Sequence, residues 1–345
     1  MVHAYWGNHR KPFIIAEMSG NHNQSLERAL AIVDAAADSG ADALKLQTYT
    51  ADTMTLDLAS AEFTIQNASS LWRGQSLHAL YQAAHTPWEW HAPIMERAQA
   101  RGMICFSSPF DASAVDFLER LDVPVYKIAS FECIDLPLIR RVAKTGKPVI
   151  ISTGMATIVE IAEAVDAARS SGCRDLTLLK CTSTYPATPE NTNVRTIPHL
   201  RDLFGCAVGL SDHTMGIGAS VAAVALGAVV IEKHFTLARA DGGVDSAFSL
   251  EPEELRSLVV ETERAWLSLG AIQYGPTPAE EPARGRRRSL YVVTDLKAGD
   301  RLSAQTVRAI RPGLGLAPKY LEQILDRQVK HDVARGTPLS WDLIA

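Results

Sequence analysis

Two histidines stand at the ends of consecutive apolar runs, and their spacing suits a shared ligand. The first run ends in Gly209-Leu-Ser-Asp-His213 and the second in Ile231-Glu-Lys-His234. The alanine-rich segment between them, 217–226, is typical of a crossover helix that joins two parallel strands. Because adjacent strands lie about 4.8 Å apart, side chains at their ends can converge. We therefore predict that His213 and His234 share a divalent metal, and the alternative is that both rings are hydrogen-bonded in a core or loop.

Two lysines interrupt otherwise apolar runs, where a charged side chain is costly unless it is paired or functional. Lys45 lies between Ala43 and Gln47, and Lys127 lies within 125–130. Serines stand near the ends of other apolar runs, at Ser108, Ser130, Ser152, Ser183 and Ser211. Amines and hydroxyls together suit a small, multiply charged anion, with phosphate plus carboxylate as the natural candidate. The alternative is that the lysines pair with Glu17 and Glu132 inside the protein.

Positioning these side chains requires the apolar runs to lie side by side, and the chain holds eight strand candidates. Most are continuously apolar, as expected of parallel strands buried on both faces. They are Phe13–Met18, Ala43–Tyr49, Met103–Ser108, Val125–Ser130, Val149–Thr153, Leu176–Thr182, Ala207–Ser211 and Val229–Phe235. Glycines precede six of them, where a helix needs a left-handed residue to end, at Gly40, Gly102, Gly146, Gly172, Gly205 and Gly227.

This alternation of strands and helices predicts a closed (β/α)8 barrel, with its chemistry at the carboxyl ends of the strands. An open doubly wound sheet is the alternative, although no G-x-G-x-x-G follows the first strand. The connection 50–86 is far longer than a typical βα loop of about 2–6 residues. We expect it to form a lid or a substrate wall, and the alternative is that Trp88 and Trp90 simply pack the start of a helix.

The barrel pattern stops after Trp266. Residues 274–288 are rich in proline and charge, which suits a linker. The predicted organisation is a barrel domain over 1–273, this linker, and a small β-rich domain over 289–345. Because so short a module has little core of its own, we expect it to dock on something.

The composition excludes several classes of protein. The 345 residues are 47% apolar and 21% charged, as is ordinary for a soluble globular protein. The net charge of −5 argues against a general nucleic-acid binder. No apolar run approaches about 18 residues and no signal peptide is recognisable, so no membrane partner is expected. Five cysteines without a C-x-x-C pair suit reduced thiols in the cytoplasm.

Seven segments, in this order along the chain, resemble motifs of the sialic acid synthases that condense phosphoenolpyruvate with a sugar. They are FIIAEMSGNHN (13–23), GADALKLQTY (40–49), YKIASFE (126–132), STGM (152–155), CTSTYP (181–186), GLSDHT (209–214) and IEKHFT (231–236). AGDRLSAQTV (298–307) and IRPGLG (310–315) resemble the family's antifreeze-like, or SAF, domain. TPWEWH (86–91), CFSSPF (105–110), KCTSTYP (180–186) and DSAFSLEP (245–252) resemble most the branch that makes pseudaminic acid.

The resemblance implies a role for each candidate residue. His213 and His234 would bind a divalent cation, manganese or magnesium, with cobalt as a further option. Phosphoenolpyruvate would be held by Lys45, Lys127, Ser108, Ser130, Ser152, Ser183 and Ser211. The sugar would contact Gln47, Tyr185 and Asp245, while Glu17 and Glu132 would be the acid/base carboxylates. In the family the tail crosses to the partner barrel of a homodimer, so Arg311 would reach the neighbour's site.

The implied reaction joins phosphoenolpyruvate, 2,4-diacetamido-2,4,6-trideoxy-L-altrose and water to give pseudaminic acid and phosphate. The same chemistry on another sugar would give N-acetylneuraminate or legionaminate. Ser183 stands where the N-acetylneuraminate branch usually has asparagine, and a serine there can still donate a hydrogen bond. A passive carbohydrate- or ice-binding protein and a metal-dependent aldolase that uses free pyruvate are alternatives from other classes. The lysines and carboxylates at the strand ends argue against the passive binder.

Overall fold

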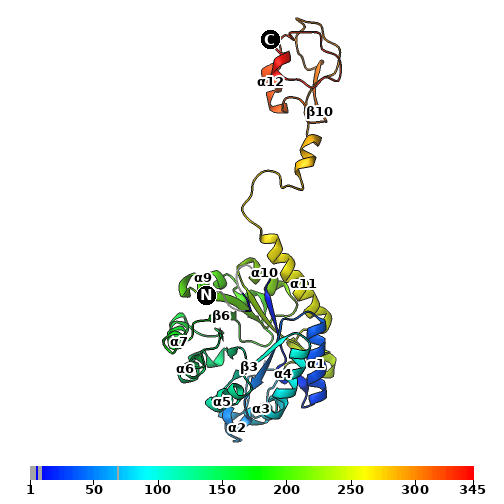
Figure 1. Ribbon diagram of the computed structural model, residues 1–345. Helices are drawn as coiled ribbons and strands as arrows, with labels where there is room; N and C mark the ends of the chain where they lie inside the picture. The colour runs from blue at the N-terminus through cyan, green and yellow to red at the C-terminus, as the bar shows by residue number, and fades with distance from the viewer. Residues whose placement is uncertain (1–4, 7–9, 68–69) are drawn as a thin grey trace. The chain divides into compact units, whose positions relative to one another are not determined.

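A closed barrel of eight parallel strands forms the first part of the computed structural model, which describes residues 5–6, 10–67 and 70–345 (Figure 1). Each strand pairs with its neighbours in chain order, and β8 pairs with β1 to close the barrel. The strands are β1 Phe13–Glu17, β2 Ala43–Thr48, β3 Ile104–Pro109, β4 Tyr126–Ile128, β5 Val149–Ser152, β6 Leu176–Cys181, β7 Ala207–Asp212 and β8 Val230–His234. The predicted barrel is confirmed, and the open sheet is excluded.

Helices surround the barrel (Figure 1). They are α1 Leu26–Asp38, α2 Ala51–Met54, α3 Leu77–Ala84, α4 His91–Ala100, α5 Ala112–Arg120, α6 Leu136–Ala143, α7 Ile158–Ser170, α8 Pro189–Thr192, α9 Thr196–Phe204, α10 Gly218–Ala225 and α11 Pro252–Leu269. Several begin at a side chain that accepts a backbone N–H, as Asp111 does for α5 and Thr157 for α7. The glycines predicted to precede strands all have positive φ, including Gly172 at 105°.

The chain divides into two compact units, residues 1–270 and 271–345. In the second unit, β9 Ser289–Val292 pairs antiparallel with β10 Val307–Ile310, and α12 spans Leu321–Ile324. Isolated bridges supply the rest of its β pairing. Its own core contains ten buried apolar residues, among them Leu290 and Leu302. Across the described residues, no helix is long and apolar enough to cross a membrane.

Candidate active site at the barrel mouth

The alternation of side chains along each strand decides which polar groups enter the barrel. Ile15 of β1, Ala43 of β2 and Val230 of β8 belong to one inner apolar cluster. Side chains two residues further along a strand point to the same face. Inward-facing residues at the carboxyl ends are therefore Glu17, Lys45, Gln47, Ser108, Lys127, Ser152, Ser211, Glu232 and His234. The strands thus bring most of the predicted site residues to one end of the barrel.

The two predicted metal ligands face each other across the mouth. The ring centroids of His213 and His234 lie 5.3 Å apart, with 63° between the ring planes. His213 Nδ1 is hydrogen-bonded to the carbonyl oxygen of Thr182 at 2.9 Å, which leaves Nε2 available. Burial, followed by the charges of His213 and Lys45, holds the pKa of His234 well below its ordinary value. The His234 ring is therefore neutral near pH 7 and has a free lone pair.

These donors fit a catalytic cation better than a structural one. His234 Nδ1 is buried and has no hydrogen-bond partner in the described part of the chain, although Asp245 Oδ2 lies 3.6 Å away. Within residues 5–6, 10–67 and 70–345, no three His, Cys, Asp or Glu side chains are grouped to hold an ion. Two imidazoles would therefore leave several coordination positions to water and substrate oxygens, as a catalytic metal requires. The metal itself remains a prediction.

Lys45 lies between two buried carboxylates. Its Nζ is 2.5 Å from Glu17 Oε2, 3.5 Å from Glu232 Oε1 and 3.3 Å from Ser108 Oγ. Gln47 Nε2 donates to Glu17 Oε1 at 3.1 Å. Burial raises the pKa of Glu17 to about 7, against the Lys45 charge and with help from Glu232. The lysine–glutamate pairing considered as an alternative therefore exists for Lys45, with Glu232 rather than Glu132 as its second carboxylate.

The second lysine belongs to a set of hydroxyls. Lys127 Nζ donates to Ser152 Oγ at 2.7 Å and to the carbonyl oxygen of Ile128 at 2.9 Å. The backbone N–H of Gly154 donates to Ser130 Oγ at 3.2 Å, and Lys127 and Ser130 are both buried. An ammonium group and several hydroxyls together make a suitable site for phosphate and carboxylate oxygens.

Gly154 keeps this site open, and the Gly154→Ala variant is expected to close it. A Cβ at this position would lie 2.1 Å from Ser183 Oγ and 2.7 Å from Ser130 Oγ. Because both hydroxyls would have to move, we expect the KM for the anionic substrate to rise about 10-fold or more. Gly218→Ala is the matched control, since a Cβ there meets nothing within 4 Å. Steady-state kinetics would contradict this role if both variants kept the wild-type KM.

An aromatic and acidic wall lines the other side of the histidines. The Tyr185 ring lies 4.5 Å from the His213 ring and 5.2 Å from the Phe248 ring, centroid to centroid. Asp245 Oδ2 accepts a hydrogen bond from Ser19, and burial raises the pKa of the Asp245 carboxyl. Tyr185 and Asp245 are thus beside the paired imidazoles, where a second substrate would have to lie.

Trp72 brings the long connection between β2 and β3 into this wall. Trp72 Nε1 donates to the carbonyl oxygen of Val244 at 3.0 Å, and its ring lies 6.2 Å from that of Tyr185. Trp88 instead packs on Phe117, with ring centroids 4.7 Å apart, immediately before α4. The helix-start alternative therefore describes Trp88. Trp72 lies beside Tyr185, and the lid or substrate wall remains a prediction.

Glu232, Phe248 and Cys181 are at the mouth but were not among the predicted site residues. Glu232 is two residues before His234 on β8, so both side chains point to the same face of the strand. This spacing was sufficient to predict Glu232 at the mouth. Phe248 ends the short 3-10 helix Ser246–Phe248, where the periodicity of strands gives no information. Cys181 Sγ is 3.9 Å from His213 Nδ1, a proximity that sequence spacing does not reveal. Two predicted residues lie outside the strands. Glu132 is in the short 3-10 helix after β4, and its Oε2 has no hydrogen-bond partner in the described structure. Arg311 belongs to the second unit.

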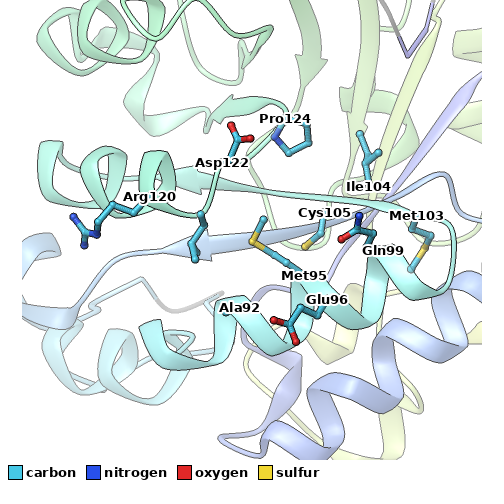
Figure 2. Close-up of a pocket in the computed structure, with 11 residues that line it drawn as sticks. Ala92, Met95, Glu96, Gln99, Met103, Ile104, Cys105, Arg120, Asp122 and Pro124 are labelled. Carbon is cyan, nitrogen blue, oxygen red and sulfur yellow. The ribbon is translucent and has the colours of Figure 1, made fainter.

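A cavity of about 560 Å³ lies elsewhere, at the amino ends of β3 and β4 (Figure 2). Its lining includes Met95, Met103 and Cys105, with Arg120 and Asp122 at the edge. Figure 2 shows the Arg120 side chain directed away from the labelled cluster of Met95 and Cys105. Because the chemistry of this fold lies at the carboxyl ends of the strands, the cavity is separate from the candidate active site.

Known proteins share both units of this chain. The model of the NeuB family matches residues 32–274, and that of the SAF domain matches 287–345. The pseudaminic acid synthase of Campylobacter jejuni is 44% identical over 96% of both chains. The N,N'-diacetyllegionaminic acid synthase of Legionella pneumophila is 37% identical over 96% of this chain and 94% of its own. A crystal structure of N-acetylneuraminic acid synthetase from Leptospira borgpetersenii, in complex with citrate, is 33% identical, with a TM-score of 0.71 over 80% of this chain and 91% of that one.

Proposed function

Because this chain belongs to the NeuB family, we propose that it condenses phosphoenolpyruvate with 2,4-diacetamido-2,4,6-trideoxy-L-altrose and water, forming pseudaminic acid and phosphate. The observation that carries the proposal is the pair of facing imidazoles beside two buried lysines. Identity to curated proteins supports this branch, at 44% for pseudaminic acid synthase against 37% for N,N'-diacetyllegionaminic acid synthase. Such a protein is a transferase that forms a carbon–carbon bond.

Separate sets of residues bind the two substrates. Lys127, Ser130 and Ser152 hold the phosphate and carboxylate of phosphoenolpyruvate and stabilise the charge of the departing phosphate. Tyr185 and Asp245 orient the open-chain sugar so that its aldehyde carbon meets C3 of the enol. A divalent cation held by the paired imidazoles would supply Lewis-acid polarisation of the aldehyde. Holding both reactants in one geometry can contribute about 7–11 kcal/mol to catalysis.

The water that adds to C2 has to lose a proton, either to a carboxylate or with the help of the metal, and we propose Glu132 as the base. Burial raises its pKa to about 7, and Oε2 has no hydrogen-bond partner in the described structure. Because the base acts ionised, kcat/KM should rise with pH up to about 7 and then level off. Glu132→Gln should lower kcat/KM about 10²–10⁴-fold and remove this acidic limb from the pH–rate profile. An unchanged limb in the variant would assign the base elsewhere, with Glu17 as the next candidate.

Purified full-length protein, assayed for phosphate release with phosphoenolpyruvate and each of three sugars, tests the proposal directly. We expect the highest kcat/KM with 2,4-diacetamido-2,4,6-trideoxy-L-altrose. A preference for N-acetylmannosamine or for the legionaminate precursor would change the branch and leave the chemistry intact. Turnover with free pyruvate in place of phosphoenolpyruvate would indicate an aldolase. No phosphate release with any sugar would support a passive binder.

We also propose a homodimer in which the second unit of one copy covers the mouth of the other barrel. Exposed apolar side chains near the carboxyl ends of β4 and β5 support a covered mouth: Phe131 is 58% exposed, Ile134 63% and Met155 60%. Arg311 would then act in the partner's site. Mixed dimers of the His213→Ala and Arg311→Ala variants should regain activity that neither variant has alone.

All five cysteines are free, which suits a cytoplasmic enzyme.

A further inference from the structure

A buried ion pair connects β7 and β8 directly behind the paired imidazoles. Lys233 Nζ lies 2.8 Å from Asp212 Oδ2, and both side chains have 0% exposure. Asp212 immediately precedes His213, Lys233 immediately precedes His234, and their Cα atoms are partners in the β7–β8 register. Neighbouring residues on a strand point to opposite faces. The ion pair is therefore on the outer face of the barrel wall, while Glu232 and His234 face inward.

The same network fixes the backbone on both sides of His213. Thr214 donates to Asp212 Oδ1 through its backbone N–H at 2.9 Å and through its hydroxyl at 2.8 Å. Lys233 Nζ also donates to the carbonyl oxygen of Thr214 at 2.5 Å. Ser220, on α10, donates to Asp212 Oδ2 at 2.7 Å. A side chain from the strand that carries His234 thus bonds to the residues before and after His213.

This degree of hydrogen bonding exceeds what strand pairing requires. Burying two charged groups away from water costs free energy. Their mutual attraction offsets that cost only when their remaining donors and acceptors are also hydrogen-bonded. Here both oxygens of Asp212 and the amine of Lys233 are bonded. An apolar pair would fill the same space on the outer wall without this cost. Because its bonds span both strands, the network restricts movement of one strand end relative to the other.

We propose that Asp212 and Lys233 are positioning residues, which hold the imidazoles of His213 and His234 at the separation that a divalent cation needs. This inference rests on the proposed metal site. Neither residue touches a substrate in the proposed reaction, because both side chains lie behind the barrel wall. The pair would set the affinity for the cation by preorganising its two protein ligands, as outer groups around metal sites do.

The test is the affinity of the metal-free, full-length protein for Mn²⁺ alone, measured by titration of the EPR signal of free Mn²⁺. Asp212→Asn, Lys233→Met and the double variant should each bind Mn²⁺ about 10–100-fold more weakly than wild type. The double variant leaves no unpaired charge, so it remains informative if a single variant does not fold. Because the two residues act as a unit, the losses of the single variants should not add in the double variant.

Thr177→Val is the matched control. Thr177 is a fully buried strand residue whose hydroxyl accepts a hydrogen bond from Trp6 at 3.0 Å. It lies near the amino end of β6, away from the carboxyl ends that carry the candidate site. Its loss should lower the melting temperature and leave the Mn²⁺ affinity unchanged. A folded double variant that binds Mn²⁺ as wild type does overturns the positioning role. Wild-type protein whose Mn²⁺ binding is absent, or insensitive to His213→Ala, overturns the metal site and with it this inference.

Discussion

The His213→Ala variant is expected to lose metal-stimulated turnover. Two imidazoles are the only protein ligands predicted for the cation, and their ring centroids lie 5.3 Å apart. With one of them removed, the cation would keep a single protein ligand. A Lewis-acid contribution of about 4 kcal/mol to the barrier corresponds to about a 10³-fold loss of kcat. Turnover by chelator-treated protein, titrated with Mn²⁺, is the measurement, and wild type and variant should differ in both affinity and maximal rate.

Another buried histidine provides the control for this variant. His91, on α4, is bonded to Thr48 Oγ1 at 2.8 Å, and burial lowers its pKa to about 4. His91→Ala removes a comparable volume and a comparable hydrogen bond, so it should cost stability but leave the Mn²⁺ response unchanged. If His213→Ala kept full metal-stimulated activity, the two histidines would be structural, which is the alternative that the sequence left open.

The barrel and most of its mouth were predictable because strand periodicity fixes both. A charged side chain in an apolar strand is expected either at the mouth of the barrel or in an ion pair. Lys45 meets both expectations. The same period places Glu232 on the same face as His234, but its pairing with Lys45 was not predicted. Sequence could not choose between Glu132 and Glu232 as the partner, because that choice depends on how far each carboxylate reaches across the barrel.

Residues on irregular segments were predictable only through family motifs. Asp245 and Tyr185 lie beyond strand ends, where no period relates sequence to direction. Trp72 reaches Val244 from a connection whose course depends on tertiary contacts rather than on local propensity. The second unit shows the same limit, since much of its pairing consists of isolated bridges rather than long strands. The relation of Arg311 to the mouth depends on assembly and remains a proposal.

Replacing Lys127 by methionine should lower activity strongly and leave the stability of the fold nearly unchanged. Lys127 is 1% exposed and bonds to a hydroxyl and a carbonyl, and among the described residues it forms no ion pair. Burial, the largest influence, lowers the pKa of its amine. Methionine of similar shape removes the cost of a buried cation but also its attraction for the buried carboxylate of Glu232, which keeps Lys45 as a partner. The free energy of unfolding should therefore change by no more than about 1 kcal/mol. Without the cation that faces phosphoenolpyruvate, kcat/KM should fall about 10²–10³-fold.

Lys45→Met gives the contrasting control, because Lys45 compensates two buried carboxylates, Glu17 and Glu232. Its loss should lower kcat/KM as well, but it should destabilise the fold by about 3 kcal/mol, since an unpaired buried charge remains. Chemical denaturation and steady-state kinetics on both variants separate the two roles. A nearly unchanged stability of Lys127→Met and a lowered stability of Lys45→Met, with a loss of activity in both, would show that Lys127 serves mainly the anion. A destabilised Lys127→Met variant with near-normal kcat/KM would show instead that its amine serves the barrel.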